Sequence, residues 1–599
     1  MKILLSVMLT FIVTPLIARS DACDRKTTPI NQIQGNQSVS PLLNQQVWIK
    51  GIVTGDFRGK AALNGYFVQS VEHDMTSNSS SGIFIHSNDM NLPLKTGDLM
   101  LINGQVSEQF EVTQINQVKH AKVCQSGHSM PQAVAIKLPL GHTNLEALEG
   151  MRVTLAKPYV ITDLYQYIKY GELIVSSHLL MSPTAKHRPG AEVTKQMKSI
   201  KQDQLVIDDG RLSEYAQPFM QGIQAGQSIS ANNPLQLGQT VQTTGILHFS
   251  FGKYKVQPTE SLQVENHILS MQVKPHRPDG QLTVATFNIE NFFTTIDTGE
   301  EICGPLKNFG CRGADSAAEY KRQLAKLVTV INTADATVMG LQELENNAKQ
   351  SIASLVTALN EAAGSNKWAY INTGLLGEDV IKVGIIYQVN LVKPVGDFAL
   401  LNQAADAEFL ENKNRIIVAQ TFVDRNSQRF NLATVHFKSK SCRDAEGIFL
   451  DQKDGQGCYN PTRVQVAQQV AKWLTNDPTG QAAEATFLVG DFNSYQQEDP
   501  MVVLKTKGFY NLAETYLGAE NWTTSYRGTV GSLDYVLANQ AAVNLSKGLT
   551  QWHINSVSIK DFGYDTEPLT ETLKKPDNFY INDPFASSDH DLVMAGFEF

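Results

Sequence analysis

Two adjacent residues near the C-terminus, Asp589 and His590, combine a carboxylate with an imidazole. They precede an apolar, alternating run over residues 592–599 that is typical of a β-strand. A histidine at the mouth of a strand can act as a general base, bind a metal ion or face solvent. The pair therefore points to a site only if other segments of the chain supply partners for it.

Candidate partners recur at the ends of other predicted strands. Apolar runs typical of strands cover residues 282–287, 337–341, 430–435, 487–489 and 533–537. A single acid or amide at such an end is commonly a turn former or a helix cap. Six strand ends with acids, amides or imidazoles, spread over about 300 residues, instead predict one shared cleft. These residues are Asn288, Glu290, Glu343, His436, Asp491, Asn493, Asp534, Asp589 and His590.

The residue types at this cleft favour phosphate chemistry. Glu343, with Asn288 and Glu290, offers hard oxygen ligands that suit Mg²⁺ or Mn²⁺ rather than zinc, with Ca²⁺ as an alternative ion. Asp491 and Asn493 share one turn, where one side chain can orient a water molecule and the other can donate to a phosphate oxygen. The pattern predicts metal-assisted hydrolysis of a phosphate ester.

Two histidines add acid–base groups to this set. His590 needs a carboxylate to orient its ring, and Asp534 is the candidate. His436 offers a second imidazole for phosphate binding or proton delivery.

These residues require an α/β scaffold. From residue 281 onward, strand-like runs alternate with helical patterns. Residues 315–334 keep the apolar spacing of a helix, with Asp315 or Ser316 as its cap, and residues 462–474 are amphipathic. We therefore expect an α/β or α+β catalytic domain over residues 281–599.

The chain before residue 281 is rich in short strands separated by glycine turns. Residues 23–135 predict a small barrel or sandwich that resembles an OB-fold, in which Tyr66 and Phe67 either stack on single strands or fill the interior. Residues 140–272 predict a second β-rich domain, whose basic run from Lys186 is either a solvated loop or a phosphate-tracking surface. Residues 273–280 predict a linker.

Residues 1–22 have the features of a signal peptide: a positive charge at Lys2, an apolar segment, and small residues before a cleavage position. No other stretch is long and apolar enough to cross a bilayer, so we expect a secreted or periplasmic protein without stable membrane association. The length of 599 residues predicts several domains. The net charge of −9 excludes nucleic-acid binding by bulk electrostatics, so such binding requires local cations.

Six cysteines in a chain with an export signal predict disulfide bonds. Six cysteines allow 15 connectivities. Spacing favours Cys303 with Cys311 and Cys442 with Cys458 as local loops, which leaves Cys23 with Cys124. No CxxC or Cys/His metal-binding spacing occurs, which argues against zinc.

The motifs around the candidate residues are similar to those of the endonuclease/exonuclease/phosphatase superfamily, which includes DNase I. That resemblance rests on residues 286–291 (TFNIEN), 340–344 (GLQEL), 490–493 (GDFN), 533–535 (LDY) and 588–590 (SDH). Residues 377–384 and 435–440, with the β-rich N-terminal half, further resemble secreted bacterial nucleases of the ExeM/NucH type. The resemblance implies a multidomain protein, with N-terminal all-β OB-like modules followed by a DNase I-like α/β four-layer sandwich.

The resemblance also implies roles for individual residues. Glu343 is expected to bind the metal ion, with Asp589 beside it and Glu290 as a further ligand. Asn288 and Asn493 are expected to bind the scissile phosphate. The remaining catalytic roles fall to Asp491, which activates water, to Asp534 with His590, and to His436, while Lys438, Arg415 and Tyr526 are expected phosphate contacts.

The implied function is a secreted, monomeric, Mg²⁺- or Mn²⁺-dependent nuclease that cleaves DNA with little sequence preference, with RNA as a further substrate. The motifs do not separate an endonuclease from an exonuclease. A phosphomonoesterase or a sphingomyelinase-like phosphodiesterase is the alternative within the same fold. A non-catalytic DNA- or matrix-binding protein is the alternative from another class, which the complete set of site residues disfavours.

The expected Cys442–Cys458 loop follows His436 closely and should stiffen a substrate-contacting segment. Closing a loop of this length contributes on the order of 3 kcal/mol in the chain-entropy model. Replacing both cysteines with serine should therefore lower both thermal stability and activity, as measured by a melting curve and a cleavage assay. Unchanged values of both quantities would contradict the expectation.

Overall fold

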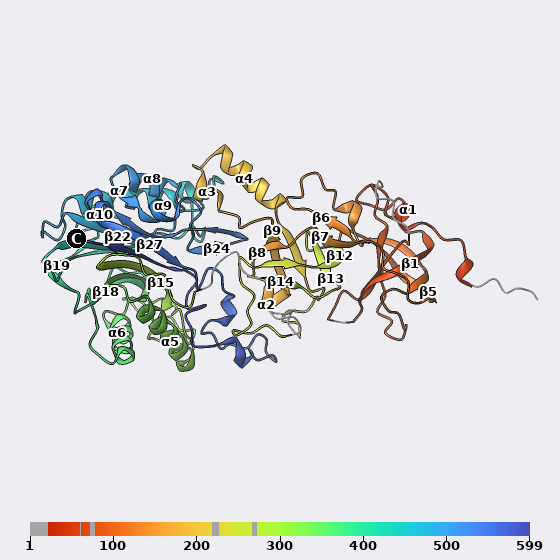
Figure 1. Cartoon of the computed structure of the whole chain (residues 1–599), viewed down its shortest axis with the longest axis horizontal. Coiled ribbons are helices and arrows are strands. Elements are labelled where there is room, and N and C mark those ends of the chain that lie inside the picture. The colour runs from red at the N-terminus through yellow and green to blue at the C-terminus, as the bar shows by residue number, and fades with distance from the viewer. Residues whose placement is uncertain (1–21, 60, 72–77, 218–226, 266–271) are drawn as a thin grey trace, which may run out of the picture. The chain divides into compact units, whose positions relative to one another are not determined.

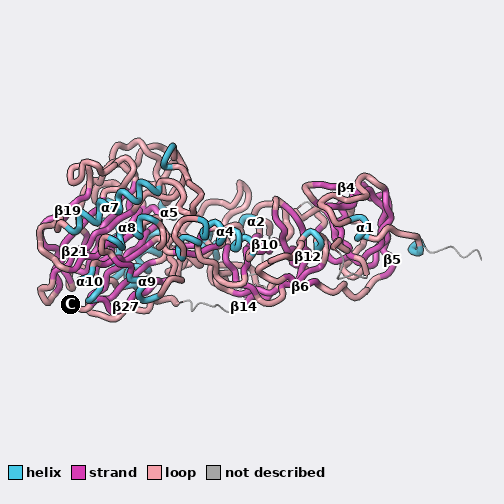
Figure 2. Tube along the Cα trace, turned by 90° about the horizontal axis from the view of Figure 1, so that it is seen from above, coloured by secondary structure: helices cyan, strands magenta, loops and turns pink. Residues whose placement is uncertain are grey.

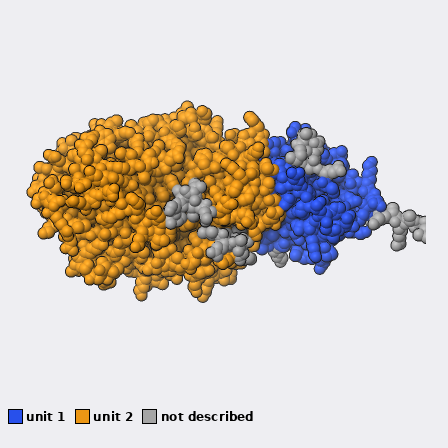
Figure 3. Space-filling model, viewed as in Figure 1, with its two compact units in different colours: residues 1–134, 144–153, 246–252 blue, residues 135–143, 154–245, 253–599 orange. Residues whose placement is uncertain are grey.

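The computed structural model describes residues 22–59, 61–71, 78–217, 227–265 and 272–599. The predicted signal peptide, apart from Ala22, lies outside these residues. In the described part of the chain, no helix has both the length and the apolar character needed to cross a membrane. The chain divides into two compact units (Figure 3): unit 1 is residues 1–134, 144–153 and 246–252, and unit 2 is residues 135–143, 154–245 and 253–599.

Unit 1 contains a closed barrel with the strand order β1-β2-β3-β5-β4. A bulge between Val53 and Gly55 lies in the part of β1 that pairs with β2, and such bulges bend strands enough to help close a barrel. Tyr66 and Phe67 are fully buried, Tyr66 in the barrel core and Phe67 in a second cluster with Phe84 and Ile246, so neither ring offers a stacking surface. The elements are α1 Ile30–Gln34, β1 Gln46–Phe57, β2 Gly65–Gln69, β3 Gly82–His86, β4 Leu99–Gln109 and β5 Val112–Gln125.

The middle of the chain forms a sheet with the order β14-β11-β8-β9-β10-β13-β12-β7-β6. Its strands are β6 Val134–Ile136, β7 Arg152–Leu155, β8 Tyr159–Asp163, β9 Glu172–Ser176, β10 Leu205–Asp208, β11 Thr240–Gln242, β12 Thr244–Ser250, β13 Lys253–Pro258 and β14 Gln263–Glu265, and its first helix is α2 Tyr167–Tyr170.

The basic run that begins at Lys186 is a loop only over residues 187–190. Its other cations lie in two helices, α3 (Pro183–Lys186) and α4 (Ala191–Gln202). Lys186 Nζ lies 2.5 Å from Glu520 Oε1, and Arg188 Nη2 lies 2.5 Å from Asp499 Oδ1. These two cations are therefore already paired within unit 2, which weakens the phosphate-tracking interpretation of the run.

The C-terminal half of the chain contains two six-stranded sheets with the orders β17-β18-β16-β15-β28-β27 and β19-β20-β21-β22-β26-β23. The first is built from β15 Leu282–Phe292, β16 Val338–Glu345, β17 Trp368–Tyr370, β18 Ile381–Gln388, β27 Ser546–Trp552 and β28 Leu592–Phe597. The second is built from β19 Val392–Leu401, β20 Ile417–Asp424, β21 Arg429–His436, β22 Ala485–Asp491, β23 Tyr510–Asn511 and β26 Asp534–Ala538, and β24 Thr524–Tyr526 with β25 Thr529–Gly531 forms a separate hairpin.

Helices cover the outer faces of this pair of sheets (Figure 1). The first sheet packs against α5 and α6, and the second against α7 to α10. Seen from above, α7, α8, α9 and α10 lie over the strands (Figure 2). Ser316 caps α5 by accepting a hydrogen bond from the Glu319 amide, as the sequence predicts. The result is a four-layer α/β sandwich. The helices are α5 Ala317–Ala334, α6 Gln350–Ala363, α7 Asn460–Thr475, α8 Asp499–Thr506, α9 Leu512–Leu517 and α10 Gln540–Leu545.

The two sheets come into close contact at Gly340. A Cβ atom there would lie 2.7 Å from Thr434 Oγ1 and 2.7 Å from Val489 Cγ2, both on the opposite sheet. Apolar residues from both sheets, among them Val383 and Phe487, form one continuous core. Because Gly340 has no side chain, β16 can approach β21 and β22 closely.

Gly340→Ala should force the sheets apart or distort the side chains, at a cost of about 1–3 kcal/mol. We expect a melting temperature several degrees below that of the wild type, measured by circular dichroism. Gly310→Ala is the matched control, because a Cβ atom at that position meets no atom within 4 Å. Equal melting temperatures for the two variants would contradict the prediction.

Candidate active site

The strand register brings polar residues of the second sheet together at one edge. His436, at the end of β21, pairs in register with Asp491 at the end of the parallel strand β22. Asp491 in turn pairs with Asp534 at the start of β26. Because side chains at paired positions lie side by side, one imidazole and two carboxylates gather on three neighbouring strands.

The first sheet contributes residues from irregular ends of β15 and β16. The register of both strands shifts near these ends, between Asn288 and Phe292 on β15 and between Leu341 and Leu344 on β16. Glu290 and Glu343 lie within these irregular segments with φ angles of 48° and 66°. Left-handed backbone at a non-glycine residue is costly, and bulges often redirect side chains near functional sites.

Asn288 connects the two sheets. Its side chain is fully buried, and its Nδ2 donates to Glu343 Oε1 at 3.2 Å and to Asp491 Oδ2 at 3.3 Å. Its Oδ1 accepts from the Glu290 amide at 3.1 Å. Asn493, on the turn after β22, donates its backbone N–H to Asp491 Oδ1 at 2.8 Å. Carboxylates from both sheets are thus held against one amide.

Asp534 and His590 form a buried pair. His590 Nδ1 lies 2.7 Å from Asp534 Oδ2, which also accepts a 2.6 Å hydrogen bond from Thr523 Oγ1. Burial disfavours the charged imidazole, but the carboxylates of Asp534 and Asp589 outweigh it and raise the pKa of His590 well above its usual value. The His590 ring is therefore a cation in this environment.

His436 has the opposite protonation state. Its Nε2 lies 3.4 Å from Asp491 Oδ2 and 3.9 Å from Glu343 Oε1. Burial and the nearby Arg415 lower its pKa well below the usual value, so the ring is neutral. The site thus contains one charged and one neutral imidazole, which is a common arrangement in acid–base catalysis.

Three carboxylates of the first sheet and its flanking loop, Glu290, Glu343 and Asp589, lie within electrostatic reach of one another. Burial and the nearby charge of Asp589 raise the pKa of Glu343, and the same two causes raise the pKa of Glu290 to about 7. Among the described residues, one lysine and no arginine forms an ion pair with them: Lys560 Nζ lies 2.7 Å from Glu290 Oε1. This excess of negative charge on oxygen ligands fits a hard divalent cation.

Asp491, Asp534 and His590 also have oxygen and nitrogen atoms within 4.8 Å of one another. His590 Nδ1 is engaged with Asp534, and a protonated ring has no lone pair for a metal ion. Burial raises the pKa of Asp491 to about 7, against the opposing charge of His590. This group is therefore suited to proton transfer, whereas Glu290, Glu343 and Asp589 are better suited to hold a metal ion.

Of the three expected phosphate contacts, which all lie in the described part of the chain, Arg415 and Lys438 lie near the candidate site and Tyr526 does not contact it. Arg415 and Lys438 lie beside the cluster: Arg415 Nη1 donates to the Phe437 carbonyl at 3.2 Å, and burial together with the charge of Arg415 lowers the pKa of Lys438. Tyr526 is 60% exposed on the β24–β25 hairpin, and no hydrogen bond between described residues links it to the cluster. The structure thus brings two of the three to the site.

Sequence reasoning missed several residues that adjoin the cluster. Arg312 lies close enough to lower the pKa values of His436 and Lys438. Lys560 and Thr523 are equally close, as the contacts above show. All three lie outside the ordered motifs, in or beside irregular segments, where no periodicity or motif marks them.

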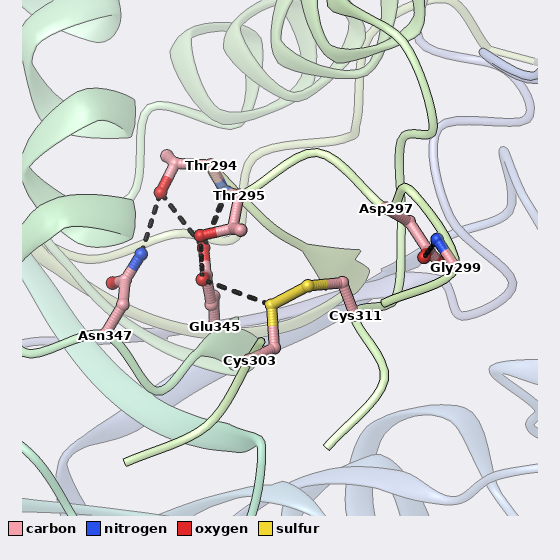
Figure 4. The surroundings of a disulfide bond; sticks show 8 residues. All are labelled: Thr294, Thr295, Asp297, Gly299, Cys303, Cys311, Glu345 and Asn347. Carbon is pink, nitrogen blue, oxygen red and sulfur yellow. Dashed lines mark hydrogen bonds between the residues drawn. A yellow bond between two sulfur atoms is a disulfide. The ribbon is translucent and has the colours of Figure 1, made fainter. Parts of the chain in front are cut away.

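Glu345 anchors the segment that precedes Arg312, around the Cys303–Cys311 disulfide (Figure 4). Glu345, two residues after Glu343, accepts from the amides of Thr294 at 2.7 Å and Thr295 at 3.0 Å. Its Oε1 also lies 3.7 Å from Cys303 Sγ, in the disulfide with Cys311. Glu345 therefore ties the loop before Arg312 to the end of β16.

The other two disulfides join Cys442 to Cys458 and Cys23 to Cys124, so all three expected pairs are present. Three disulfides favour an oxidising environment.

Residues of the middle region support the hairpin beside the site. The Val530 amide donates to the Leu180 carbonyl at 2.8 Å, and the Ser182 amide donates to the Val530 carbonyl at 2.8 Å. Leu237 packs with Trp522 and Val530 in one apolar cluster. Trp522 immediately precedes Thr523, the residue that holds Asp534, so the middle region helps to fix this part of the site.

Comparison with known families gives two matches. The model of the Endonuclease/Exonuclease/phosphatase family matches residues 285–590, and a domain of unknown function (DUF8508) matches residues 141–267. No curated protein matches the chain by sequence.

Solved structures match about half of the chain at low identity. Mannosyl-6-phosphatase Bt3783 of Bacteroides thetaiotaomicron is 16% identical with a TM-score of 0.32, and the match covers 53% of this chain and 100% of that one. The human Nocturnin catalytic domain with bound sulfate is 14% identical with a TM-score of 0.32, and the match covers 52% of this chain and 93% of that one. D. rerio TDP2 in complex with a single-strand DNA product is 14% identical with a TM-score of 0.30, and the match covers 53% of this chain and 98% of that one. These values do not distinguish substrates.

The family match spans more than half of the 599 residues and contains the whole candidate site from Asn288 to His590. The chain belongs to the Endonuclease/Exonuclease/phosphatase family, whose members are hydrolases that act as nucleases or phosphatases and generally use divalent metal ions.

Proposed function

We propose that this protein is a secreted, metal-dependent nuclease that hydrolyses DNA phosphodiester bonds with little sequence preference. The observation that carries the proposal is the shared contact of Asn288 with Glu343 and Asp491, next to the charged His590–Asp534 pair. A metal-binding carboxylate, a proton acceptor and a proton donor thus lie around one buried amide, which is the set that phosphodiester hydrolysis requires.

Glu343, Asp589 and Glu290 are the proposed ligands of Mg²⁺ or Mn²⁺. When bound, such an ion neutralises phosphate charge and polarises the phosphorus–oxygen bond. Lys560 pairs with Glu290 and leaves Glu343 and Asp589 without a lysine or arginine partner among the described residues.

The remaining residues handle the phosphate and the protons. Asp491, whose pKa lies at about 7, can accept a proton from an attacking water molecule near neutral pH. Asn288 and Asn493 are the proposed phosphate contacts, in which a phosphate oxygen would replace one of the two acceptors that each side-chain amide has now. Neutral His436 can donate one further hydrogen bond. The charged His590 can stabilise the developing negative charge or donate a proton to the leaving oxygen, while Asp534 keeps its ring oriented.

Positive charges beside the site favour a substrate larger than a simple ester. Arg312, Arg415 and Lys438 lie within electrostatic reach of one another, next to His436. Such a group can contact phosphates on either side of the scissile bond. A phosphomonoesterase or a sphingomyelinase-like phosphodiesterase is the second candidate, because the metal-binding and acid–base residues do not define the leaving group.

The other parts of the chain fit this proposal. Disulfides and the signal-like residues 1–22 support secretion or a periplasmic location. The closed barrel of β1 to β5 supports an OB-like assignment, and OB-folds commonly bind oligonucleotides. We propose a monomer in which this barrel and residues 140–272 accompany a catalytic domain over residues 281–599.

Incubating the purified protein with supercoiled circular DNA and with linear DNA tests the proposed activity directly. The purified protein should cleave DNA with Mg²⁺ and not with EDTA, because the carboxylate cluster requires a cation. Nicked circles would show an endonuclease, and degradation of linear DNA alone would show an exonuclease. Release of phosphate from small esters without any DNA cleavage would overturn the nuclease proposal.

His590→Ala should reduce kcat by roughly 10²–10⁴-fold, the usual contribution of an acid–base group. The fold should persist, because His590 lies at the mouth of β28 and its loop is held by other contacts, such as Ser588 Oγ to the Asn288 carbonyl at 2.7 Å. Circular dichroism checks the fold, and His142→Ala at an exposed position is the control. Full activity of the His590 variant would place the site elsewhere.

A further inference from the structure

We propose that a groove beside the candidate site binds the nucleotide that flanks the scissile phosphodiester. The groove has a volume of about 640 Å³ and lies between Lys413 and the loop closed by the Cys442–Cys458 disulfide. The proposal rests on the nuclease function proposed above and specifies its substrate as a polynucleotide strand.

Two lysines and two aromatic rings form a stack in this groove. The Lys413 ammonium lies 3.6 Å from the ring centroid of Phe449, and the Lys438 ammonium lies 4.8 Å from that of Tyr459. The two rings are themselves stacked, with centroids 5.7 Å apart and an interplanar angle of 26°. Aromatic faces hold a cation without neutralising it. Among the described residues, no carboxylate forms an ion pair with Lys413, so its charge is available to a phosphate.

The groove begins where the proposed phosphate site ends. Lys438 lies two residues after His436 and lines the groove. The Phe437 carbonyl between them accepts from Asn493 Nδ2 at 3.1 Å and from Arg415 Nη1 at 3.2 Å. A strand whose scissile phosphate contacts Asn493 can therefore continue past Lys438 towards Lys413.

The loop that forms one wall is held in place from below. Arg463 is fully buried and donates to the carbonyls of Cys458 and Gln456, each at 2.7 Å. Tyr459 Oη donates to the Arg443 carbonyl at 2.9 Å. With the disulfide, these contacts fix the wall before any ligand arrives, which reduces the entropy lost on binding.

The other lining residues favour a nucleotide with its base over a bare phosphate. Ile448 is 69% exposed and offers an apolar contact for a base. Asp444 and Glu446 also line the groove, and their carboxylates are exposed. Carboxylates repel phosphate but accept hydrogen bonds from exocyclic base amines. The combination of separate cations, carboxylates and an apolar side chain matches the parts of one nucleotide.

The test compares two substrates with the full-length protein. One is a single-stranded deoxyoctanucleotide, which can enter the groove, and the other is bis(p-nitrophenyl) phosphate, a diester without flanking nucleotides. Lys413→Gln should lower the ratio of kcat/KM for the oligonucleotide to that for the small diester by about 5–10-fold, mainly through KM. The slope of log KM against log salt should fall by about 0.7, as for one lost phosphate contact on a single strand.

A second variant and two controls guard against misfolding. Ile448→Asp changes an exposed side chain and should lower the same ratio, whereas Lys413→Arg should restore it. Lys393→Gln removes an exposed lysine on the edge strand β19 and should keep the wild-type ratio. If the ratio of the two kcat/KM values stays within twofold of the wild type for both Lys413→Gln and Ile448→Asp, the groove does not bind a nucleotide. The proposed nuclease function would remain intact. A wild-type protein that turns over only the small diester would overturn both.

Discussion

The buried amide of Asn288 lies between a carboxylate of one sheet, Glu343, and a carboxylate of the other, Asp491. Its two hydrogen bonds exist only because the sheets come very close together, as the crowding around Gly340 shows. Burial of these carboxylates raises their pKa values and concentrates negative charge that a cation can neutralise. The packing of one sheet on the other therefore determines the chemistry of the site.

Elements outside the two sheets hold this arrangement in place. Thr523 fixes Asp534, and the middle region packs against Trp522 and pairs with Val530. Glu345 anchors the loop of the Cys303–Cys311 disulfide. Long-range contacts of this kind limit the motion of the side chains that must keep their positions during catalysis. Leu180, Ser182 and Leu237, which lie within the match to the domain of unknown function, thus contact the segment that holds Asp534.

Much of the catalytic half follows from local patterns. Strands begin and end close to the apolar runs, Ser316 caps α5, and the polar residues at strand ends meet in one cleft because neighbouring strands end at the same edge. The basic run from Lys186 instead depends on distant residues, because its partners Glu520 and Asp499 lie more than 300 positions along the chain. Local composition cannot reveal partners at such separations.

The sequence by itself determined which chemical groups are available, their order along the chain, and the spacing that favours the three disulfide pairs. Only the tertiary structure decided that His590 is charged while His436 is neutral, because burial and the neighbouring charges set each pKa. It also decided that irregular strand ends direct Glu290 and Glu343 into the cleft, and that Lys560, Arg312 and Thr523 join them. These properties depend on distances between residues that are remote in the sequence, which no local pattern encodes.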